Sequence, residues 1–333
     1  VRVLILNPHE PIAADLLLRL IHQARQSEML TAVLELLREA KLHPYLTLAY
    51  GAAASLMQGD FRDSIAALQQ LGAMRAPRPD ILARLRPMAF KLNAEAIEGL
   101  GDFHGAYDAY VALNRLEQGK AVSLNDFQQV ILAAAARDVP ALPADPHANH
   151  LVMTGFPRSG TTLLENALAA HPQIETFEEI PATASMEMYL QGALPRVQTD
   201  ADAIQTYLRG RDRYYDEEMR RHRKAGAKVF IDKLPMRSAE AAFMAKLFPD
   251  KRYIFSIRHP FDVVLSCFKQ YFGRNIAMEH FRSFEGAVNL YDFTMRQWFG
   301  VYGLDDPRVH YLRYDALVEE FDASVRGVLG FLG

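Results

Sequence analysis

A glycine-bounded loop between an apolar run and a helical pattern constrains this chain more than any other feature. Leu151, Val152 and Met153 form the apolar run, residues 155–162 read GFPRSGTT, and LLENALAAH follows with helical spacing of its apolar residues. This order predicts a strand, a tight loop and a helix N-terminus, where backbone N–H groups and the helix dipole converge on an anion. We therefore expect an anion site here, with an unliganded strand-to-helix turn as the plainer alternative.

The loop departs at one position from the phosphate-binding pattern G-x-x-x-x-G-K-[ST]. Thr161 stands where that pattern has lysine, and the basic residue is instead Arg158, earlier in the loop. Nucleoside triphosphatases use the lysine on the β- and γ-phosphates. Its absence argues against ATP or GTP chemistry.

Composition narrows the class of protein. The chain has 333 residues, half of them apolar, and a net charge of −3, so two domains fit and nucleic acid is not the expected partner. The single cysteine, Cys267, rules out an internal disulfide and predicts a reducing, cytoplasmic location. We find no signal peptide and no apolar run long enough for a bilayer. The chain begins at Val1 rather than Met, which leaves open what precedes it.

Residues 1–138 predict an all-α domain. Two helix–turn–helix patterns share a Gly-Asp-Phe turn, beginning at Gly59 and Gly101, 42 residues apart. They resemble tetratricopeptide repeats, whose usual period is about 34 residues, and the proline-rich segment 76–79 is expected to lengthen the connection. An irregular helical domain is the alternative. A repeat array would offer a surface to a peptide, a protein partner or another copy of the chain.

A proline-rich stretch, residues 139–149, is predicted to be the linker to a second domain over residues 150–333. There, the strand-like runs LVMTGF, KVFIDK, RYIFSIR and RVHYLRY alternate with helical patterns. This alternation predicts an α/β fold with a parallel sheet. Ligands of such sheets bind beyond the carboxyl ends of the strands.

Polar residues follow three of these segments. Lys233 ends the second predicted strand, while Arg258, with Ser266 eight residues later, follows the third and suits a second phosphate. A predicted loop over residues 171–181 carries Glu178 and Glu179. A carboxylate beside an anion pocket can act as a general base for a hydroxyl group. The plainer alternatives are a surface lysine for Lys233, a structural ion pair for Arg258 and a solvated acidic turn for the two glutamates.

Taken together, these motifs resemble a known family. GFPRSGTT, HP with EE, DKLP, IRHPFDVVLS and YLRYDALV occur in the order typical of sulfotransferases that use 3′-phosphoadenosine-5′-phosphosulfate (PAPS). The segment from HP to EEIP is most similar to the protein-tyrosine sulfotransferase branch. The helical half resembles bacterial proteins that join such repeats to a sulfotransferase domain.

The resemblance implies a role for each matching residue. The 5′-phosphosulfate would be held by the loop residues Arg158, Ser159, Gly160, Thr161 and Thr162, and the 3′-phosphate by Arg258 and Ser266. Glu179 would be the catalytic base, with His259 as the alternative, and no metal would be needed. Lys233 would stabilise the leaving phosphate's bridging oxygen, and Arg158 the transferring group. Adenosine 3′,5′-bisphosphate would be the product.

Two departures from the family pattern bear on the substrate. Residues 180–183, Ile-Pro-Ala-Thr, stand where tyrosine-protein enzymes carry basic residues, which puts an acidic peptide acceptor in doubt. The chain also stops at Gly333, where the family continues into a basic, glycine-rich segment, so the domain's C-terminal end is expected to be incomplete.

The function expected from the sequence is sulfuryl transfer from PAPS to an acceptor hydroxyl, on a phenol, tyrosyl group, sugar or other small molecule. A small-molecule kinase is the first alternative, and Thr161 argues against it. The second is a repeat-based adaptor whose sulfotransferase-like domain is inactive.

Overall fold

A computed structural model describes residues 6–74, 79–116, 123–146, 149–180, 182–221, 226–273 and 275–333. By the contacts between their residues, they fall into two compact units. The first lies within Val1–Ala121 and Phe268–Gly273, and the second within Val122–Cys267 and Arg274–Gly333. None of the helices in the described ranges is both long and apolar enough to cross a membrane.

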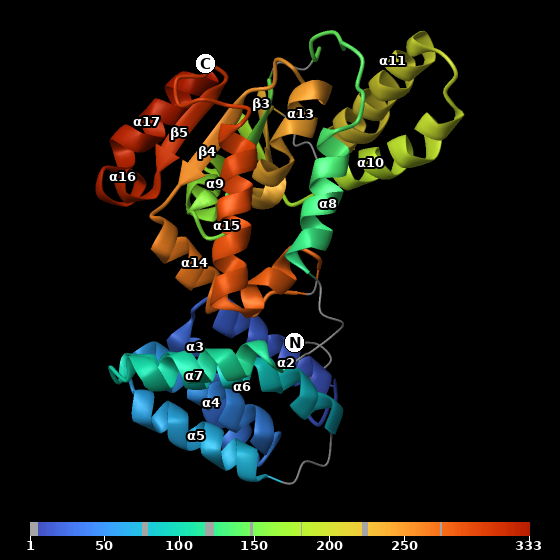
Figure 1. Ribbon diagram of the computed structural model, residues 1–333. Coiled ribbons are helices and arrows are strands. Elements are labelled where there is room, and N and C mark those ends of the chain that lie inside the picture. Colours follow the sequence, from blue (N-terminus) through green and yellow to red (C-terminus); the bar gives the residue numbers. More distant parts are fainter. Residues whose placement is uncertain are drawn as a thin grey trace. The chain divides into compact units, whose positions relative to one another are not determined.

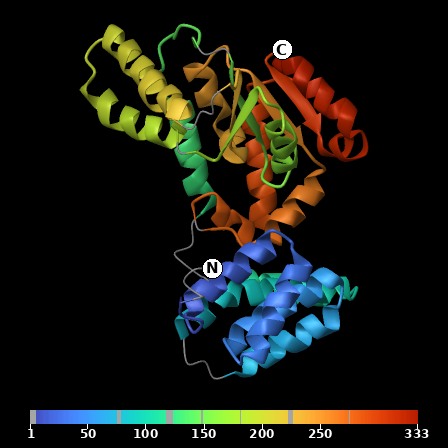
Figure 2. The same cartoon turned by 180° about the vertical axis from the view of Figure 1, so that it is seen from behind.

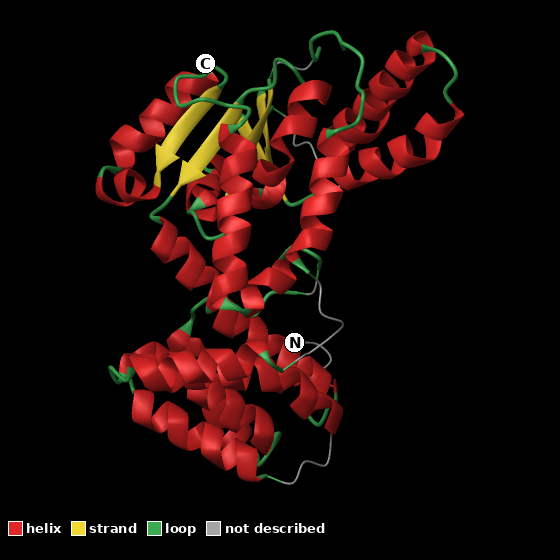
Figure 3. Ribbon diagram, viewed as in Figure 1, coloured by secondary structure: helices red, strands yellow, loops and turns green. Residues whose placement is uncertain are grey.

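The described elements of the first unit are helices, drawn in blue to cyan in Figure 1 and in red in Figure 3. They are α2 (Pro11–Gln23), α3 (Ser27–Glu39), α4 (Pro44–Gln58), α5 (Phe61–Ala73), α6 (Pro79–Gly99) and α7 (Phe103–Asn114). The all-α prediction for this part of the chain is therefore confirmed over the described residues. Part of the predicted proline-rich connection, residues 76–78, lies outside them.

The two Gly-Asp-Phe turns build the same local structure. Gly59 and Gly101 adopt φ of 85° and 83°, a left-handed conformation that only glycine adopts at little cost. Asp60 and Asp102 then stand at the N-cap positions of α5 and α7, and Asp102 accepts a hydrogen bond from the backbone N–H of Gly105. Two helical hairpins, α4–α5 and α6–α7, are the result. Their membership of the tetratricopeptide class stays a prediction.

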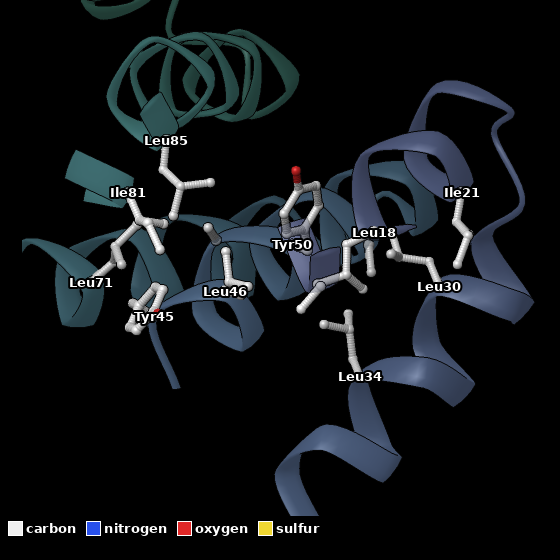
Figure 4. Packing of buried hydrophobic residues seen from close by; sticks show 13 residues of the cluster. Leu18, Ile21, Leu30, Leu34, Tyr45, Leu46, Tyr50, Leu71, Ile81 and Leu85 are labelled. Atoms are coloured by element: carbon white, nitrogen blue, oxygen red, sulfur yellow. The ribbon is translucent and has the colours of Figure 1, made fainter. Parts of the chain in front are cut away.

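The core of this unit lies where α2, α3, α4, α5 and α6 meet, as Figure 4 shows. Leu18, Leu30 and Leu46 are completely buried there. Tyr50 is also buried, and its hydroxyl donates to the carboxylate of Asp15 at 2.8 Å, so the polar end of the ring is satisfied inside the core.

The second unit is built on a parallel sheet, as predicted. Its strands are β1 (His150–Gly155), β2 (Ile174–Glu178), β3 (Val229–Lys233), β4 (Tyr253–Ile257) and β5 (Val309–Arg313). Their order in the sheet is β2-β3-β1-β4-β5, and all neighbours pair in parallel. Their carboxyl ends therefore meet at one edge, and this edge carries the predicted site residues.

The strand β2 corrects the prediction of a loop over residues 171–181. Its sequence, IETFE, is short and includes two glutamates, so it lacks the apolar character expected of a buried parallel strand. It forms the edge of the sheet and pairs with β3, from Ile174 with Val229 to Glu178 with Lys233. An edge position tolerates polar residues, and a polar strand of this kind has a sequence pattern that also predicts a loop.

Helices cover both faces of this sheet. The helices of this unit are α8 (Leu124–Ala135), α9 (Thr161–Ala169), α10 (Ala182–Ala193), α11 (Asp200–Arg209), α12 (Glu217–Arg221), α13 (Ala241–Leu247), α14 (Pro260–Phe268), α15 (Phe284–Phe299), α16 (Tyr314–Glu319) and α17 (Phe321–Leu332). The 3₁₀ segments η1 (Leu194–Arg196), η3 (Pro235–Glu240) and η4 (Met278–Arg282) and the π-helical segment η2 (Gly210–Asp216) connect them.

Each face has its own apolar cluster. On one face, α9 and α17 pack on Met153 and Ile231, and the green α9 lies over the strands in Figure 2. On the other face, α15 crosses the sheet in Figure 1, and its residue Trp298 stacks on Phe255 with ring centroids 4.3 Å apart. Because both faces are covered, β1 is buried along its whole length.

The proline-rich segment differs from the linker that was predicted over residues 139–149. By contacts, the division falls near residue 121, and α8 belongs to the second unit. Leu142 is buried, and the guanidinium of Arg211 donates to the carbonyl oxygens of Pro143 at 2.8 Å and Ala144 at 3.2 Å. The segment is therefore packed onto the second unit along residues 142–145. Residues 147–148 lie outside the described ranges.

A buried ion pair between Asp145 and Lys251 fixes this segment, since the side chains of both residues are almost fully buried. Replacing Asp145 with Asn leaves the Lys251 ammonium without its charge partner, and we expect a loss of about 3–5 kcal/mol in the free energy of unfolding. Urea denaturation followed by the fluorescence of Trp298, the single tryptophan, measures it. The control, Asp292→Asn, breaks an exposed ion pair with Arg296 and is expected to change little. Equal stability of both variants contradicts the prediction.

Candidate active site

The loop between β1 and α9 has the geometry of an anion site. Gly160 adopts φ of 97° as the N-cap of α9, which begins at Thr161. The first backbone N–H groups of a helix have no partner within the helix, so those of Thr161 and Thr162 are available to a ligand. Thr161 is buried and Thr162 is exposed.

Serine hydroxyls tie the carbonyl oxygens of this loop back into the protein. Ser238 on η3 donates to the carbonyl of Gly155 at 2.7 Å. Ser256 on β4 donates to the carbonyl of Ser159, also at 2.7 Å. Both carbonyl oxygens therefore already have a donor from the protein, which reduces their repulsion of an anion.

The single cysteine also supports the loop. The Cys267 thiol on α14 is buried and donates to the carbonyl oxygen of Pro157 at 3.4 Å. Burial raises the pKa of this thiol to about 12, against a smaller lowering by the charge of Arg158. Cys267 is therefore a neutral packing residue rather than a nucleophile.

Two arginines and a serine meet beside the loop. The Arg158 Nε donates to the Ser266 hydroxyl at 3.1 Å, and an Arg258 terminal nitrogen donates to the Arg158 carbonyl oxygen at 3.3 Å. Asp262, one helical turn beyond Arg258, lies 3.6 Å from its Nε. The sequence placed Arg158 and Ser266 in separate phosphate sites, whereas the structure joins them by a hydrogen bond.

Tyr314, at the start of α16, completes this cationic group. Its ring lies under the Arg258 guanidinium, 4.4 Å from carbon to ring centroid. The same ring lies so near Gly160 that a Cβ there would approach it to 2.4 Å. The absence of a side chain at position 160 is thus required both by φ and by the tyrosine.

A second group of charges surrounds Lys233. Its ammonium lies 2.9 Å from Glu178 Oε1, 3.1 Å from Glu165 Oε2 and 3.9 Å from Glu179 Oε1. The side chains of Lys233 and Glu165 are only 2% and 8% exposed, whereas those of Glu178 and Glu179 are 65% and 57% exposed. Lys233 is therefore not the mobile surface charge that a strand end suggests.

The balance of burial and charge decides the protonation state of Lys233. Burial alone lowers the pKa of its ammonium, but hydrogen bonds and Coulomb attraction from Glu178 and Glu165 outweigh burial and raise that pKa above its usual value. Lys233 therefore carries its positive charge at neutral pH.

Two of the predicted site residues hold strained backbone conformations. Arg158 has φ of 70° and Glu179 has φ of 51°, both in the left-handed region that disfavours residues with a Cβ. Each costs about 1–3 kcal/mol, and such strain concentrates at functional sites. The hydrogen bond from the Glu179 N–H to the Lys233 carbonyl, 3.0 Å long, fixes the conformation next to the lysine.

The structure thus sorts the predicted residues into two groups. Arg158, Arg258 and Ser266 form one, and Lys233 and Glu179 form the other. His259, the alternative base, is exposed, and its ring lies against Phe261. Glu165 and Tyr314 were not among the residues predicted for the site. Glu165 had a signal, because its spacing from Thr161, Leu164 and Leu168 puts a charged residue on the buried stripe of α9.

The comparison with known families agrees with the motifs. The model of a sulfotransferase family matches residues 151–333, more than half of the chain. The chain therefore belongs to the sulfotransferase family, and that part of the prediction is confirmed. The tyrosine branch and the use of PAPS remain predictions.

Individual relatives are distant. An uncharacterized protein of Aquifex aeolicus (strain VF5) is 23% identical over 325 residues, which cover 91% of this chain and 42% of that protein. The chain thus spans less than half of its curated relative. Among solved structures, a sulfotransferase from Alicyclobacillus acidocaldarius is 16% identical with a TM-score of 0.37, covering 57% of this chain and 82% of its own. The sulfotransferase domain of the Synechococcus PCC 7002 olefin synthase is 20% identical with a TM-score of 0.37, and the match covers 58% of this chain and 76% of that domain's chain.

Replacing Gly160 with Ala tests the packing of the loop. The left-handed φ and the contact with Tyr314 predict a loss of about 2–4 kcal/mol in stability. In a Tyr314→Ala background the contact is gone, and the cost should fall to about 1–2 kcal/mol. Urea denaturation of the unmodified chain, the two single variants and the double variant measures both values.

Gly192→Ala is the matched control, since Gly192 lies in helix α10 with open space around it. This control should leave stability unchanged or raise it by up to about 1 kcal/mol. If Gly160→Ala behaves like the control, the loop does not depend on its glycine.

Proposed function

We propose that this chain transfers the sulfuryl group of PAPS to a hydroxyl group of an acceptor. The observation that carries the proposal is the position of Glu179 beside Lys233, 3.9 Å apart, on the strand edge that the anion loop shares. A base and a fixed cation, next to an anion site, are the groups that such a transfer needs.

The donor fits the charges around the loop. Its 5′-phosphosulfate would receive hydrogen bonds from the backbone of Gly160, Thr161 and Thr162, at the positive end of α9. The buried Ser159 hydroxyl, which has no hydrogen-bond partner among the described residues, supports a polar ligand or water beside the loop. Its 3′-phosphate would bind the guanidinium of Arg258 and the hydroxyl of Ser266, with Arg158 bridging the two ends.

The chain's own residues would divide the reaction between them. Glu179 accepts the proton of the acceptor hydroxyl as that oxygen forms its bond to sulfur. Lys233 and the loop N–H groups stabilise the charge that develops as the bond from sulfur to the bridging phosphate oxygen breaks. Adenosine 3′,5′-bisphosphate leaves. Positioning carries much of the rate, and the base adds about 10²–10⁴-fold.

The acceptor is defined only as a compound with a hydroxyl group. Residues 180–183, of which the structure describes Ile180, Ala182 and Thr183, offer no basic side chain to an acidic peptide. A phenol or sugar therefore suits this edge better than a tyrosine in an acidic sequence. Partner binding or self-association through the helical unit, and the cytoplasmic location, stay predictions.

The second phosphate distinguishes this proposal from an ATP-dependent one. In calorimetric titrations, adenosine 3′,5′-bisphosphate should bind and ADP should bind much more weakly. Arg258→Ala should weaken binding of the bisphosphate about 10–100-fold, because charged hydrogen bonds to a phosphate are lost. Equal binding of the two nucleotides, with or without Mg²⁺, contradicts the proposed donor.

The base assignment has a separate test. Glu179→Gln keeps the shape of the side chain and removes the proton acceptor, so turnover should fall by about 10²-fold or more while bisphosphate binding is kept. His259→Gln is the control for the alternative base. Mass spectrometry of acceptor panels with PAPS detects the added sulfuryl group. If the Glu179 variant keeps its rate and the His259 variant loses it, the base is His259.

A further inference from the structure

Glu165 is a buried carboxylate with no assigned role. It lies on the face of α9 that packs against the sheet, among residues that are otherwise apolar or small. Its Oε2 lies 3.1 Å from the Lys233 ammonium, and both side chains are more than nine-tenths buried. A buried charge costs stability that an apolar residue would not, so an ion pair at this position calls for an explanation.

Glu178 contacts the same ammonium in a different environment. It is the nearer carboxylate, at 2.9 Å, but about two thirds of its side chain is exposed to solvent. Glu179, at 3.9 Å, is also exposed. Within the described ranges, the carboxylates that face Lys233 are thus one buried residue on α9 and two exposed residues, Glu178 at the end of β2 and Glu179 directly after it.

The number of donors on lysine limits how many partners it can hold. An ammonium has three N–H groups, and Glu165 and Glu178 lie within hydrogen-bonding range of two of them. One N–H group therefore remains for an anion that arrives from the loop side, but both carboxylates repel that anion unless one of them moves away. Glu178 is the one that can move into solvent, whereas Glu165 is enclosed by the packing of α9.

We infer that Glu165 is a positioning residue that keeps Lys233 charged and aimed at the donor, while Glu178 gives up its contact with Lys233 when the donor binds. The identity of the donor rests on the proposed function. The ion pair itself does not, because both of its partners are residues of this chain.

This arrangement differs from a purely structural ion pair in its dependence on pH. The raised pKa of Lys233 means that its charge is present below that pKa and is lost as pH rises through it. Without Glu165, fewer carboxylates offset the effect of burial, so the pKa of the Lys233 ammonium falls. The alkaline loss of activity should then begin at a lower pH, which a loss of packing alone would not produce.

The test compares Glu165→Gln, Glu178→Gln and, as the matched control, Glu279→Gln, which breaks a largely buried ion pair with Arg282 on η4. A ¹⁵N NMR titration follows the Lys233 ammonium directly. Glu165→Gln should lower its pKa by about one unit or more, as loss of a close buried partner does, and the control should leave it unchanged. The alkaline limb of kcat should move with it, with the acceptor KM little changed.

Glu178→Gln should act in the opposite sense on ligand binding. It removes the carboxylate that competes for Lys233, so adenosine 3′,5′-bisphosphate should bind about 3–10-fold more tightly. Weaker binding in this variant overturns the exchange at Glu178. An unchanged Lys233 pKa in Glu165→Gln overturns the role of Glu165.

The two proposals can fail separately. If the unmodified chain transfers no sulfuryl group, the proposed function fails, yet the NMR titration still decides what Glu165 does to Lys233. If Glu165→Gln does not fold, Glu165→Asp keeps the charge but withdraws it by one methylene group. A measurable fall in the Lys233 pKa relative to the unmodified chain then supports the inference, and no fall overturns it.

Discussion

The site depends on one constraint, which is that the anion loop is held by its carbonyl oxygens. The Ser238 hydroxyl on η3 and the Ser256 hydroxyl on β4 donate hydrogen bonds to the carbonyl oxygens of Gly155 and Ser159. The Cys267 thiol donates to the carbonyl oxygen of Pro157. With the acceptors engaged in the protein, the ligand side of the loop is left to N–H donors and the helix dipole. The left-handed conformations at Arg158 and Gly160 are compatible with this arrangement.

The charges follow from the same edge of the sheet. The parallel register puts Glu178 of β2 opposite Lys233 of β3, and β1 pairs with β3 on its other side. Lys233 therefore lies on the middle one of three neighbouring strands. The cations Arg158 and Arg258 gather at β4 and α14 instead, beside Tyr314. In the proposed function, the N–H groups at the start of α9 would hold one anionic group of the ligand and the two arginines a second. This arrangement, rather than the loop alone, favours a nucleotide with a second phosphate.

Much of the second unit could be predicted from sequence, because its signals are local. The strands β1, β3, β4 and β5 are apolar or β-branched runs, and the loop has glycines at fixed positions. The strand β2 could not be recognised, since a polar edge strand has no such pattern. The Arg158–Ser266 bond and the Lys233–Glu165 pair join residues far apart in sequence, and packing alone decides them. The packed segment over residues 142–145 resembled a linker because proline predicts a break but not what it contacts.

The most direct measurement of this account is a crystal structure of the chain with adenosine 3′,5′-bisphosphate. The account predicts the 5′-phosphate at the N-terminus of α9, within hydrogen-bonding distance of the backbone of Thr161 and Thr162. It predicts the 3′-phosphate on Arg258 and Ser266, and Lys233 still paired with Glu165. A nucleotide bound elsewhere, or bound with its 3′-phosphate away from Arg258, would contradict it.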